Sequence, residues 1–214
     1  QKYGNKFVLR VQLIATHNER HIWAESFERE IRETSDIIGI QSQIAESIAQ
    51  KLKATITPEE KQLIGKTPTT NLTAYDFYQR GRDELIINES DTNIIKKKIK
   101  LAEEMFHKAL EYDSTFALAY IGLADVYFVA QRFNNSYFAE NYADSMLILA
   151  DRALSYDNHL AEGYAYKAGY YWMNGKIEQC IKEIDKALEY NPNYGKGYYM
   201  KAYWVYLLDY NMDL

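Results

Sequence analysis

Three segments in the second half of the chain repeat one pattern: Ala109-Leu-Glu-Tyr-Asp-Ser-Thr-Phe116, Ala153-Leu-Ser-Tyr-Asp-Asn-His-Leu160 and Ala187-Leu-Glu-Tyr-Asn-Pro-Asn-Tyr194. Each leading alanine is followed at the same distance by a tyrosine, and these are Tyr120, Tyr164 and Tyr198. The alanines lie 44 and then 34 residues apart, and so do the tyrosines. A spacing of 34 residues in helical sequence indicates a repeat architecture. Such solenoids present surfaces for partners.

Composition excludes several function classes. The 214 residues are 47% hydrophobic and 26% charged, as in ordinary globular proteins of one or two domains. The net charge of −5 argues against a nucleic-acid surface, which needs a basic stripe. No apolar run approaches the ~20 residues that cross a bilayer. A cytoplasmic or periplasmic location would depend on a transmembrane segment before Gln1, so the sequence leaves localisation open.

The first ~65 residues indicate a small α/β unit. Alternating apolar residues over 7–13 predict a strand, and the polar residues 17–20 predict a turn. A second strand follows, with Trp23 and Phe27 on one face. These features predict a β-hairpin.

A helix is predicted next, capped by Ser35 or Asp36. Its apolar stripe consists of Ile37, Ile40, Ile44, Ile48 and Leu52. Thr57-Pro58-Glu59-Glu60 is a capping box that predicts a second, short helix. A hairpin with one helix is too small to fold alone, so we expect the rest of this unit before Gln1 or from another chain.

Residues 66–72 have linker composition, and the remaining residues, 73–214, resemble tetratricopeptide repeats. We predict repeats over 73–116, 117–160 and 161–194, with a truncated fourth repeat over 195–214. The repeat needs small residues at positions 8, 20 and 27, where helices cross closely, and large ones at 4, 11 and 24. The third repeat meets this pattern without gaps, through Tyr164, Ala168, Tyr171, Cys180, Ile184, Ala187 and the turn former Pro192.

The other repeats depart from the pattern. The second repeat carries ten extra residues between Tyr127 and Met146, and exchanges large and small at Met146 and Ala150. The first, with Phe77, Gly81, Ala102, Phe106 and Ala109, has about nine extra residues. We expect longer helices and loops to hold them. The fourth stops at Leu214 after its first helix.

The amino-terminal part carries a second resemblance. Residues 7–13, 22–30 and 40–45 resemble the end of a TolB amino-terminal-like (FlgO-like) domain, which we place at residues 1–65. That domain followed by tetratricopeptide repeats is similar to the carboxy-terminal part of bacterial class III adenylyl cyclases and of some winged-helix regulators. The resemblance implies a place in bacterial signal transduction, with the output domain outside this sequence.

No catalytic, cofactor or metal site is indicated. His17 and His21 lie in the expected turn without a completing ligand set, and His107 and His159 are isolated. Cys180 occupies a small, buried repeat position, so we expect a structural thiol. The sequence contains no nucleophile elbow, phosphate loop or glycine fingerprint.

The candidate site is an aromatic stripe. In tetratricopeptide proteins, positions 2, 5, 9, 12 and 13 of the first helix line the concave face. By register the stripe comprises Phe128, Trp172, Tyr199, Tyr203 and Tyr206, with Leu85 in the first repeat. Such rings could anchor a partner segment. The alternative is that a following helix and later repeats cover Tyr199, Tyr203 and Tyr206.

The lysine and asparagine set that clamps a terminal carboxylate in some such proteins is absent here, because Ile121, Ala165, Asp125 and Gly169 hold those positions.

The sequence therefore predicts a mainly α chain, an α-solenoid preceded by an α/β remnant, that acts without catalysis as a protein-interaction and sensory module. Its partner would be a protein or peptide. We also expect self-association through the hairpin and the exposed tyrosines. The alternatives are the regulatory end of an adenylate cyclase, the sensor part of a winged-helix regulator, and a stand-alone scaffold.

Overall fold

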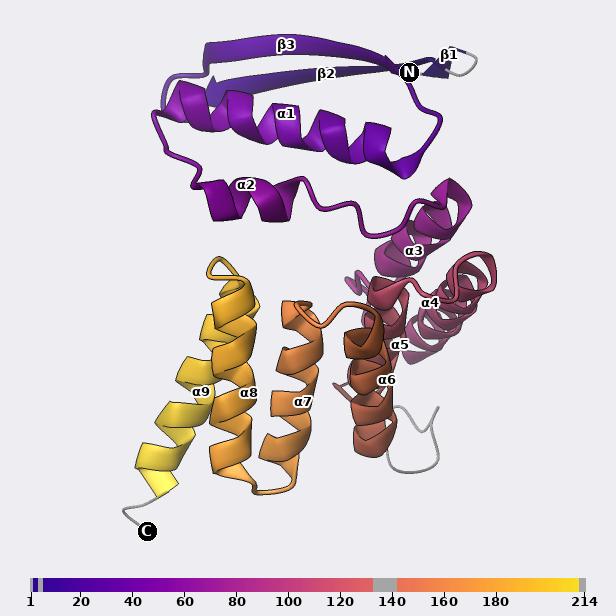
Figure 1. Ribbon diagram of the computed structural model, residues 1–214, viewed down its shortest axis with the longest axis vertical. Helices are drawn as coiled ribbons and strands as arrows, with labels where there is room; N and C mark the ends of the chain where they lie inside the picture. The colour runs from indigo at the N-terminus through magenta and orange to yellow at the C-terminus, as the bar shows by residue number, and fades with distance from the viewer. Residues whose placement is uncertain (1, 4–5, 133–141, 212–214) are drawn as a thin grey trace. The chain divides into compact units, whose positions relative to one another are not determined.

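The computed structural model describes residues 2–3, 6–132 and 142–211. The chain divides into two compact units, Gln1–Leu72 and Thr73–Leu214, and each is described by itself (Figure 1).

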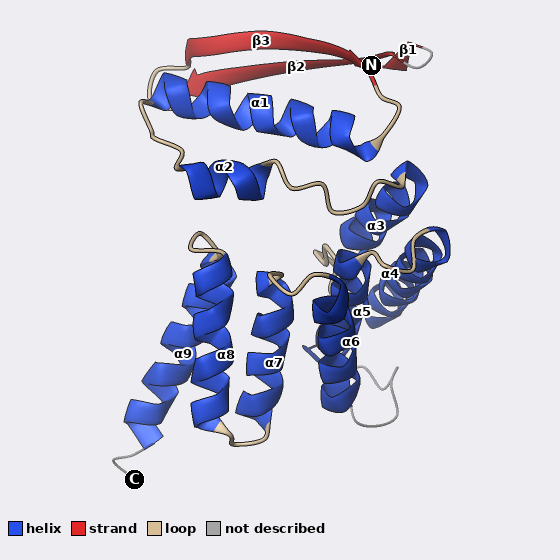
Figure 2. Cartoon of the chain, viewed as in Figure 1, coloured by secondary structure: helices blue, strands red, loops and turns tan. Residues whose placement is uncertain are grey.

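The first unit contains the predicted hairpin. Strand β2 (Lys6–Ala15) pairs antiparallel with β3 (Arg20–Glu30), and opposite pairs include Leu9 with Phe27 and Leu13 with Trp23. A two-residue strand, β1 (Lys2–Tyr3), adds to β2 and was too short for any periodic signal. Helix α1 (Thr34–Leu52) lies along one face of the hairpin (Figure 2). Arg10 and Gln12 of β2, the polar residues of the alternating pattern, are exposed.

The start of α1 corrects one prediction. Neither Ser35 nor Asp36 is the N-cap, because the helix begins at Thr34 after Glu33. The Asp36 carboxylate instead accepts hydrogen bonds from the backbone N–H groups of Arg32 at 2.8 Å and Glu33 at 3.1 Å. The cap is thus a carboxylate that reaches back from the first turn.

The apolar stripe of α1 is confirmed only in part. Ile40 is buried, as is Ile38, which lies outside the predicted stripe. Leu52, in the last turn, is exposed, so the stripe ends before the helix does. The second helix, α2 (Pro58–Ile64), is confirmed, with its N-cap at Thr57: the backbone N–H of Glu60 donates to Thr57 Oγ1 at 3.2 Å, and that of Thr57 donates to Glu60 Oε2 at 2.7 Å.

The second unit consists of helix pairs. Its helices are α3 (Leu72–Glu84), α4 (Thr92–Tyr112), α5 (Ala117–Arg132), α6 (Tyr142–Tyr156), α7 (Ala161–Met173), α8 (Ile177–Tyr190) and α9 (Gly195–Asn211). The pairs α5/α6 and α7/α8 pack closely as helix hairpins, and α9 packs on α8. Helix α3 contacts α4 through the ring pairs Phe77–Tyr112 and Tyr78–Phe106. The predicted fold, a mainly helical solenoid of tetratricopeptide type after a hairpin and helix, is confirmed.

Small residues lie where the repeat requires them. The alanines at position 27, namely Ala109, Ala153 and Ala187, are fully buried. In the first repeat Phe106 is buried between two glycines: a Cβ at Gly81 would lie 2.7 Å from its ring, and one at Gly122 would lie closer still. Only glycine therefore allows α3 and α5 to approach this ring.

The segment that recurs three times has one local structure. After each second helix, the backbone N–H of the residue two positions on donates to a side-chain oxygen of Asp113, Asp157 or Asn191, closing the same turn. The tyrosine directly before each of these Asp or Asn residues packs its ring against the aromatic side chain at position 4 of the same repeat. These pairs are Phe77–Tyr112, Tyr120–Tyr156 and Tyr164–Tyr190, with centroids 5.3–5.8 Å apart. The repeated sequence thus encodes a turn and a ring contact together.

The extra residues of the first repeat lie where expected. Helix α4 is 21 residues long, and Asp91, at the end of the connecting loop, is its N-cap. Residues 133–141, which hold most of the second insertion, lie outside the described residues.

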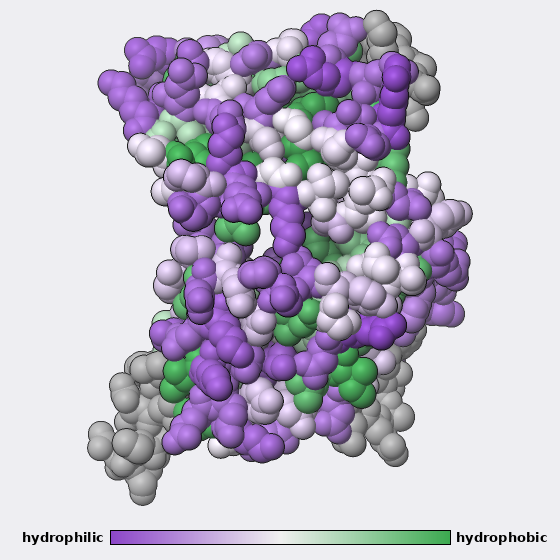
Figure 3. All heavy atoms as spheres, viewed as in Figure 1, coloured by the Kyte–Doolittle hydropathy of each residue, from purple (hydrophilic) through white to green (hydrophobic). Residues whose placement is uncertain are grey.

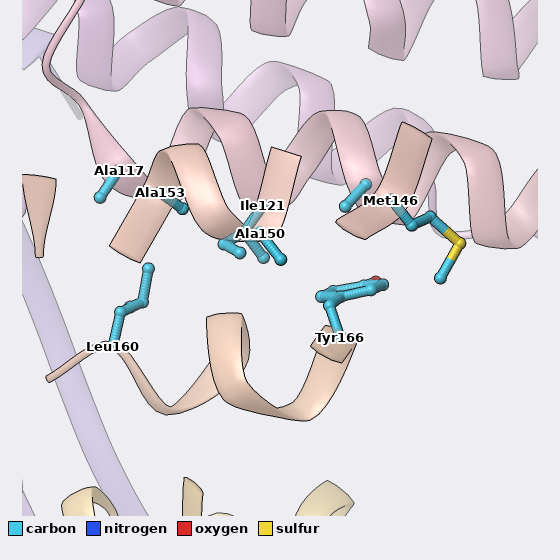
Figure 4. Close-up of a cluster of buried hydrophobic side chains, with 8 residues drawn as sticks. Ala117, Ile121, Met146, Ala150, Ala153, Leu160 and Tyr166 are labelled. Atoms are coloured by element: carbon cyan, nitrogen blue, oxygen red, sulfur yellow. The ribbon is translucent and has the colours of Figure 1, made fainter. Parts of the chain in front are cut away.

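Two cores hold the later repeats together. Between the second and third repeats, Leu160 and Tyr166 point toward the α5/α6 pair, where Ile121, Met146 and Ala150 are buried (Figure 4). The predicted exchange at Met146 and Ala150 is accommodated, since both side chains are buried. The next core contains Ala168, Cys180, Ile184, Ala187 and Trp204.

Ion pairs join neighbouring repeats at equivalent positions. Lys167 Nζ lies 2.8 Å from Asp151 Oδ1, and Lys201 Nζ lies 2.6 Å from Asp185 Oδ1. In both pairs the lysine follows the aspartate by 16 residues, so the two junctions use the same contact.

Candidate partner-binding face

Side chains of α5, α7 and α9 meet on one side of the helix pairs, which we call the first-helix face. The Tyr166 hydroxyl of α7 donates a hydrogen bond to Asp125 Oδ1 of α5. Lys196 Nζ of α9 lies 3.6 Å from the same oxygen. Three first helices, from three repeats, therefore contribute to one cluster of side chains.

The Lys196 ammonium also lies over two aromatic rings. It is 5.5 Å from the ring centroid of Phe128 and 5.3 Å from that of Tyr166. A cation within about 6 Å of a ring face is attracted by the ring quadrupole. The cluster of Asp125, Phe128, Tyr166 and Lys196, called the cation cluster below, thus joins one carboxylate, two rings and one ammonium.

Acidic groups surround this cluster. Burial raises the pKa of the half-buried Glu162 carboxyl, and the nearby Asp125 and Asp157 carboxylates raise it further. Burial also raises the pKa of the Tyr166 phenol, helped by Asp125, and that of the Tyr194 phenol, helped by Glu162 and Asp125. Lys196 opposes the shift at Glu162. The local field at the cluster is therefore negative apart from this lysine.

The aromatic residues predicted from the sequence have different environments. Phe128 is 41% exposed, Tyr199 is 70% exposed and Tyr203 is 48% exposed. The rings of Tyr199 and Tyr203 stack with centroids 6.2 Å apart and planes 14° apart. The side chain of Tyr206 lies outside the described side chains. Three of the predicted rings are thus accessible.

Trp172 lies in a more enclosed place than these three. It is half-buried, packs against the core of the third repeat, and stacks on Trp204. Leu85, its counterpart in the first repeat, is half-buried as well. The repeat pattern did not indicate Trp204. It indicated Asp125 only as a residue that stands where other repeat proteins have a lysine or asparagine that binds a terminal carboxylate.

The other residues considered from the sequence have structural or surface positions. Cys180 is fully buried as expected, and burial raises the pKa of its thiol to about 11. His17 and His21 are exposed in and beside the hairpin turn, and the His159 ring packs edge-on against Tyr190. Within the described residues, no three His, Cys, Asp or Glu side chains gather closely enough to hold a metal ion.

The surface in view in Figure 3 shows hydrophobic residues as separate patches among hydrophilic ones. Among the described helices, none combines the length and apolar character needed to span a membrane. Among the described residues, the exposed aromatic side chains are mainly tyrosines, which present an apolar ring and a polar tip.

No protein-family model matches the chain. A similar curated protein, "Putative adenylate cyclase 3" of Rhizobium meliloti (strain 1021), is 23% identical over 124 residues. The match covers 58% of this chain and 20% of that protein. The chain therefore corresponds to about a fifth of its relative's length.

Several solved structures are similar to that of the chain over part of its length. The first TPR of Spaghetti (RPAP3) bound to the HSP90 peptide SRMEEVD is 13% identical, with a TM-score of 0.48 over 67% of this chain and 99% of that one. MamA is 14% identical, with a TM-score of 0.40 over 76% of this chain and 91% of that one. YrrB, a TPR protein with an unusual peptide-binding site, is 11% identical, with a TM-score of 0.39 over 78% of this chain and 88% of that one. The fold assignment above rests on the helix pairs themselves.

Proposed function

We propose that the chain is a non-catalytic protein-interaction and sensory module whose first-helix face binds a segment of a protein or peptide partner. One observation carries the proposal: Phe128 on α5 and Tyr199 and Tyr203 on α9, all on first helices of repeats, remain accessible in the folded chain. Aromatic side chains of this kind dominate binding hot spots. Repeat solenoids use such extended faces for partners.

A larger signalling protein is the context we favour. The match to an adenylate cyclase supports a regulatory role beside a catalytic domain outside this sequence. In this proposal residues 1–65 are the end of a TolB amino-terminal-like domain, 66–72 a linker and 73–214 the repeats. The sensor part of a winged-helix regulator is the second candidate. Sequencing the gene upstream of the Gln1 codon decides between them, because the two predict different output domains.

Self-association is part of the proposal. Strand β3 lies at the edge of its sheet, and edge strands pair readily with other chains. Light scattering at about 100 µM should show a species larger than one chain. A monomer at that concentration contradicts this part alone.

The binding proposal is tested by selecting 12-residue peptides from a displayed random library against the whole chain. We expect Phe128→Ala and Tyr203→Ala to weaken the selected peptides at least about tenfold, as hot-spot residues do. Ile148→Ala is the matched control, because Ile148 is an exposed apolar residue on the second helix α6. Selected peptides that bind all three variants as well as the unchanged chain would rule out the first-helix face.

A further inference from the structure

We propose that the cation cluster is a subsite for a basic side chain, that Lys196 is its internal occupant, and that the partner inserts an arginine or lysine in place of Lys196. This inference names the chemistry of the partner and so rests on the proposed function. The partner is thus a basic peptide segment.

The geometry is that of a cation site. Phe128 and Tyr166 present ring faces to one ammonium at 5.5 and 5.3 Å, on helices from two repeats. The Tyr166 hydroxyl, by donating to Asp125 Oδ1, fixes the carboxylate beside these rings. Rings and a carboxylate converging on one point recognise ammonium and guanidinium groups.

Lys196 occupies the site loosely. Its Nζ lies 3.6 Å from Asp125 Oδ1, beyond hydrogen-bond length, whereas Lys201 and Lys167 lie 2.6 and 2.8 Å from their carboxylates. The Lys196 side chain is 47% exposed. It can therefore swing into solvent without a change in the backbone, which leaves the rings and the carboxylate in place.

The charge balance favours a basic partner over an acidic one. Asp125 and the half-buried Glu162 are two carboxylic groups near one lysine. Residues 73–214 contain 21 Asp and Glu against 15 Lys and Arg, a net charge of −6. An acidic segment would be repelled by this field, and a basic one would be steered toward it.

Arginine is the better occupant. Its planar guanidinium can stack on a ring face while its N–H fork bonds both oxygens of a carboxylate. Lys196 offers only a point charge. We therefore expect arginine to displace Lys196 more readily than lysine does.

The test uses the whole chain and a small probe, acetyl-arginine methylamide. Binding is followed by NMR of the Phe128 and Tyr166 ring signals, with acetyl-citrulline methylamide as the neutral analogue. An internal occupant lowers apparent affinity by the fraction of time it fills the site, so Lys196→Ala should bind the probe about tenfold more tightly. Lys201→Ala, which removes a lysine of the same helix paired with Asp185, should bind as the unchanged chain does.

Two further variants guard against misfolding. Asp125→Asn in the Lys196→Ala background should abolish the shifts. Phe128→Leu keeps apolar volume, removes a ring face, and should weaken probe binding several-fold while Tyr166 still reports it. Equal binding of citrulline and arginine, or no gain from Lys196→Ala, overturns the inference.

The outcome separates this inference from the proposed function. Library peptides that depend on Phe128 and Tyr203 but lack basic residues would sustain the function and refute the cation subsite. Arginine binding that follows the expected variants, without peptides that depend on these rings, would sustain the subsite and refute the function.

Discussion

The indole ring of Trp172 in α7 lies 5.6 Å from that of Trp204 in α9, with the two planes 19° apart. Trp204 is only 7% exposed, and it is the residue of α9 buried most deeply among the described large side chains. The stack therefore fastens the last helix to the repeat before it. It also covers one face of the half-buried Trp172 ring, so this tryptophan has a packing role in the junction between α7 and α9.

The first prediction concerns this stack. Trp204→Ala should cost about 3–5 kcal/mol of unfolding free energy, as for a buried aromatic. Trp172→Ala should cost less, since its ring is half-buried. The double variant should reveal a coupling of about 0.5–1.5 kcal/mol, typical of ring pairs. Urea unfolding followed by circular dichroism measures all three, and strictly additive losses would mean that the two rings do not interact.

The second prediction concerns the close helix crossing at Ala187. Because Ala187 is fully buried, Ala187→Leu should overpack the crossing and cost about 1–3 kcal/mol. Ala202→Leu is the matched control: Ala202 is exposed on α9, and the change should stay within about 0.5 kcal/mol. Chemical denaturation compares the two, and equal costs would refute the crossing as the cause.

The third prediction concerns the recurring turn. The Tyr164 hydroxyl donates to the Asn158 carbonyl at 2.8 Å, as that of Tyr120 does to Ser114 at 3.0 Å. Tyr164→Phe should therefore cost about 0.5–1.5 kcal/mol. Tyr198→Phe should cost almost nothing, because the exposed Tyr198 makes no such bond within the described residues. A thermal unfolding series decides this, and a Tyr198→Phe loss as large as that of Tyr164→Phe would contradict it.

The fourth prediction concerns Cys180. With its pKa raised to about 11 by burial, the thiol should react with a disulfide reagent at pH 8 at least about a hundredfold more slowly than in guanidinium. Because folding raises this pKa, the stabilisation from the neutral thiol is complete below about pH 8.5, the unfolded value, and declines as the pH rises toward 11. The stability difference from Cys180→Ala should narrow over that range. Fast labelling of the native chain would show that the thiol is accessible.

The sequence predicted the helix pairs well, because their packing depends on residue size at fixed spacing. Ala109, Ala153 and Ala187 are buried where the period places them. The capping box at Thr57 was equally readable, since its hydrogen bonds join residues three apart.

Other features depend on contacts that spacing does not encode. The predicted start of α1 was wrong because the Asp36 carboxylate, in the first turn, accepts the hydrogen bonds from the backbone N–H groups of Arg32 and Glu33. Ser35 and Asp36 therefore lie inside the helix and not at its N-cap. The cation cluster joins residues as far apart as Asp125 and Lys196, and their meeting depends on the angle between successive helix pairs. Trp204 holds none of the repeat positions that the pattern requires to be large, so its burial reflects how α9 packs on α7.

The equivalent ion pairs Asp151–Lys167 and Asp185–Lys201 bear on how the number of repeats in such a chain can increase. A second copy of residues 161–194, inserted after Tyr194, would bring its own Lys167 to the original Asp185 and offer its own Asp185 to Lys201. Each new junction would also meet an alanine at the crossing. Tandem duplication of this segment would therefore preserve the ion pair at every new junction. At the first junction His107 and Leu123 hold the two equivalent positions, so duplication there would not reproduce the pair.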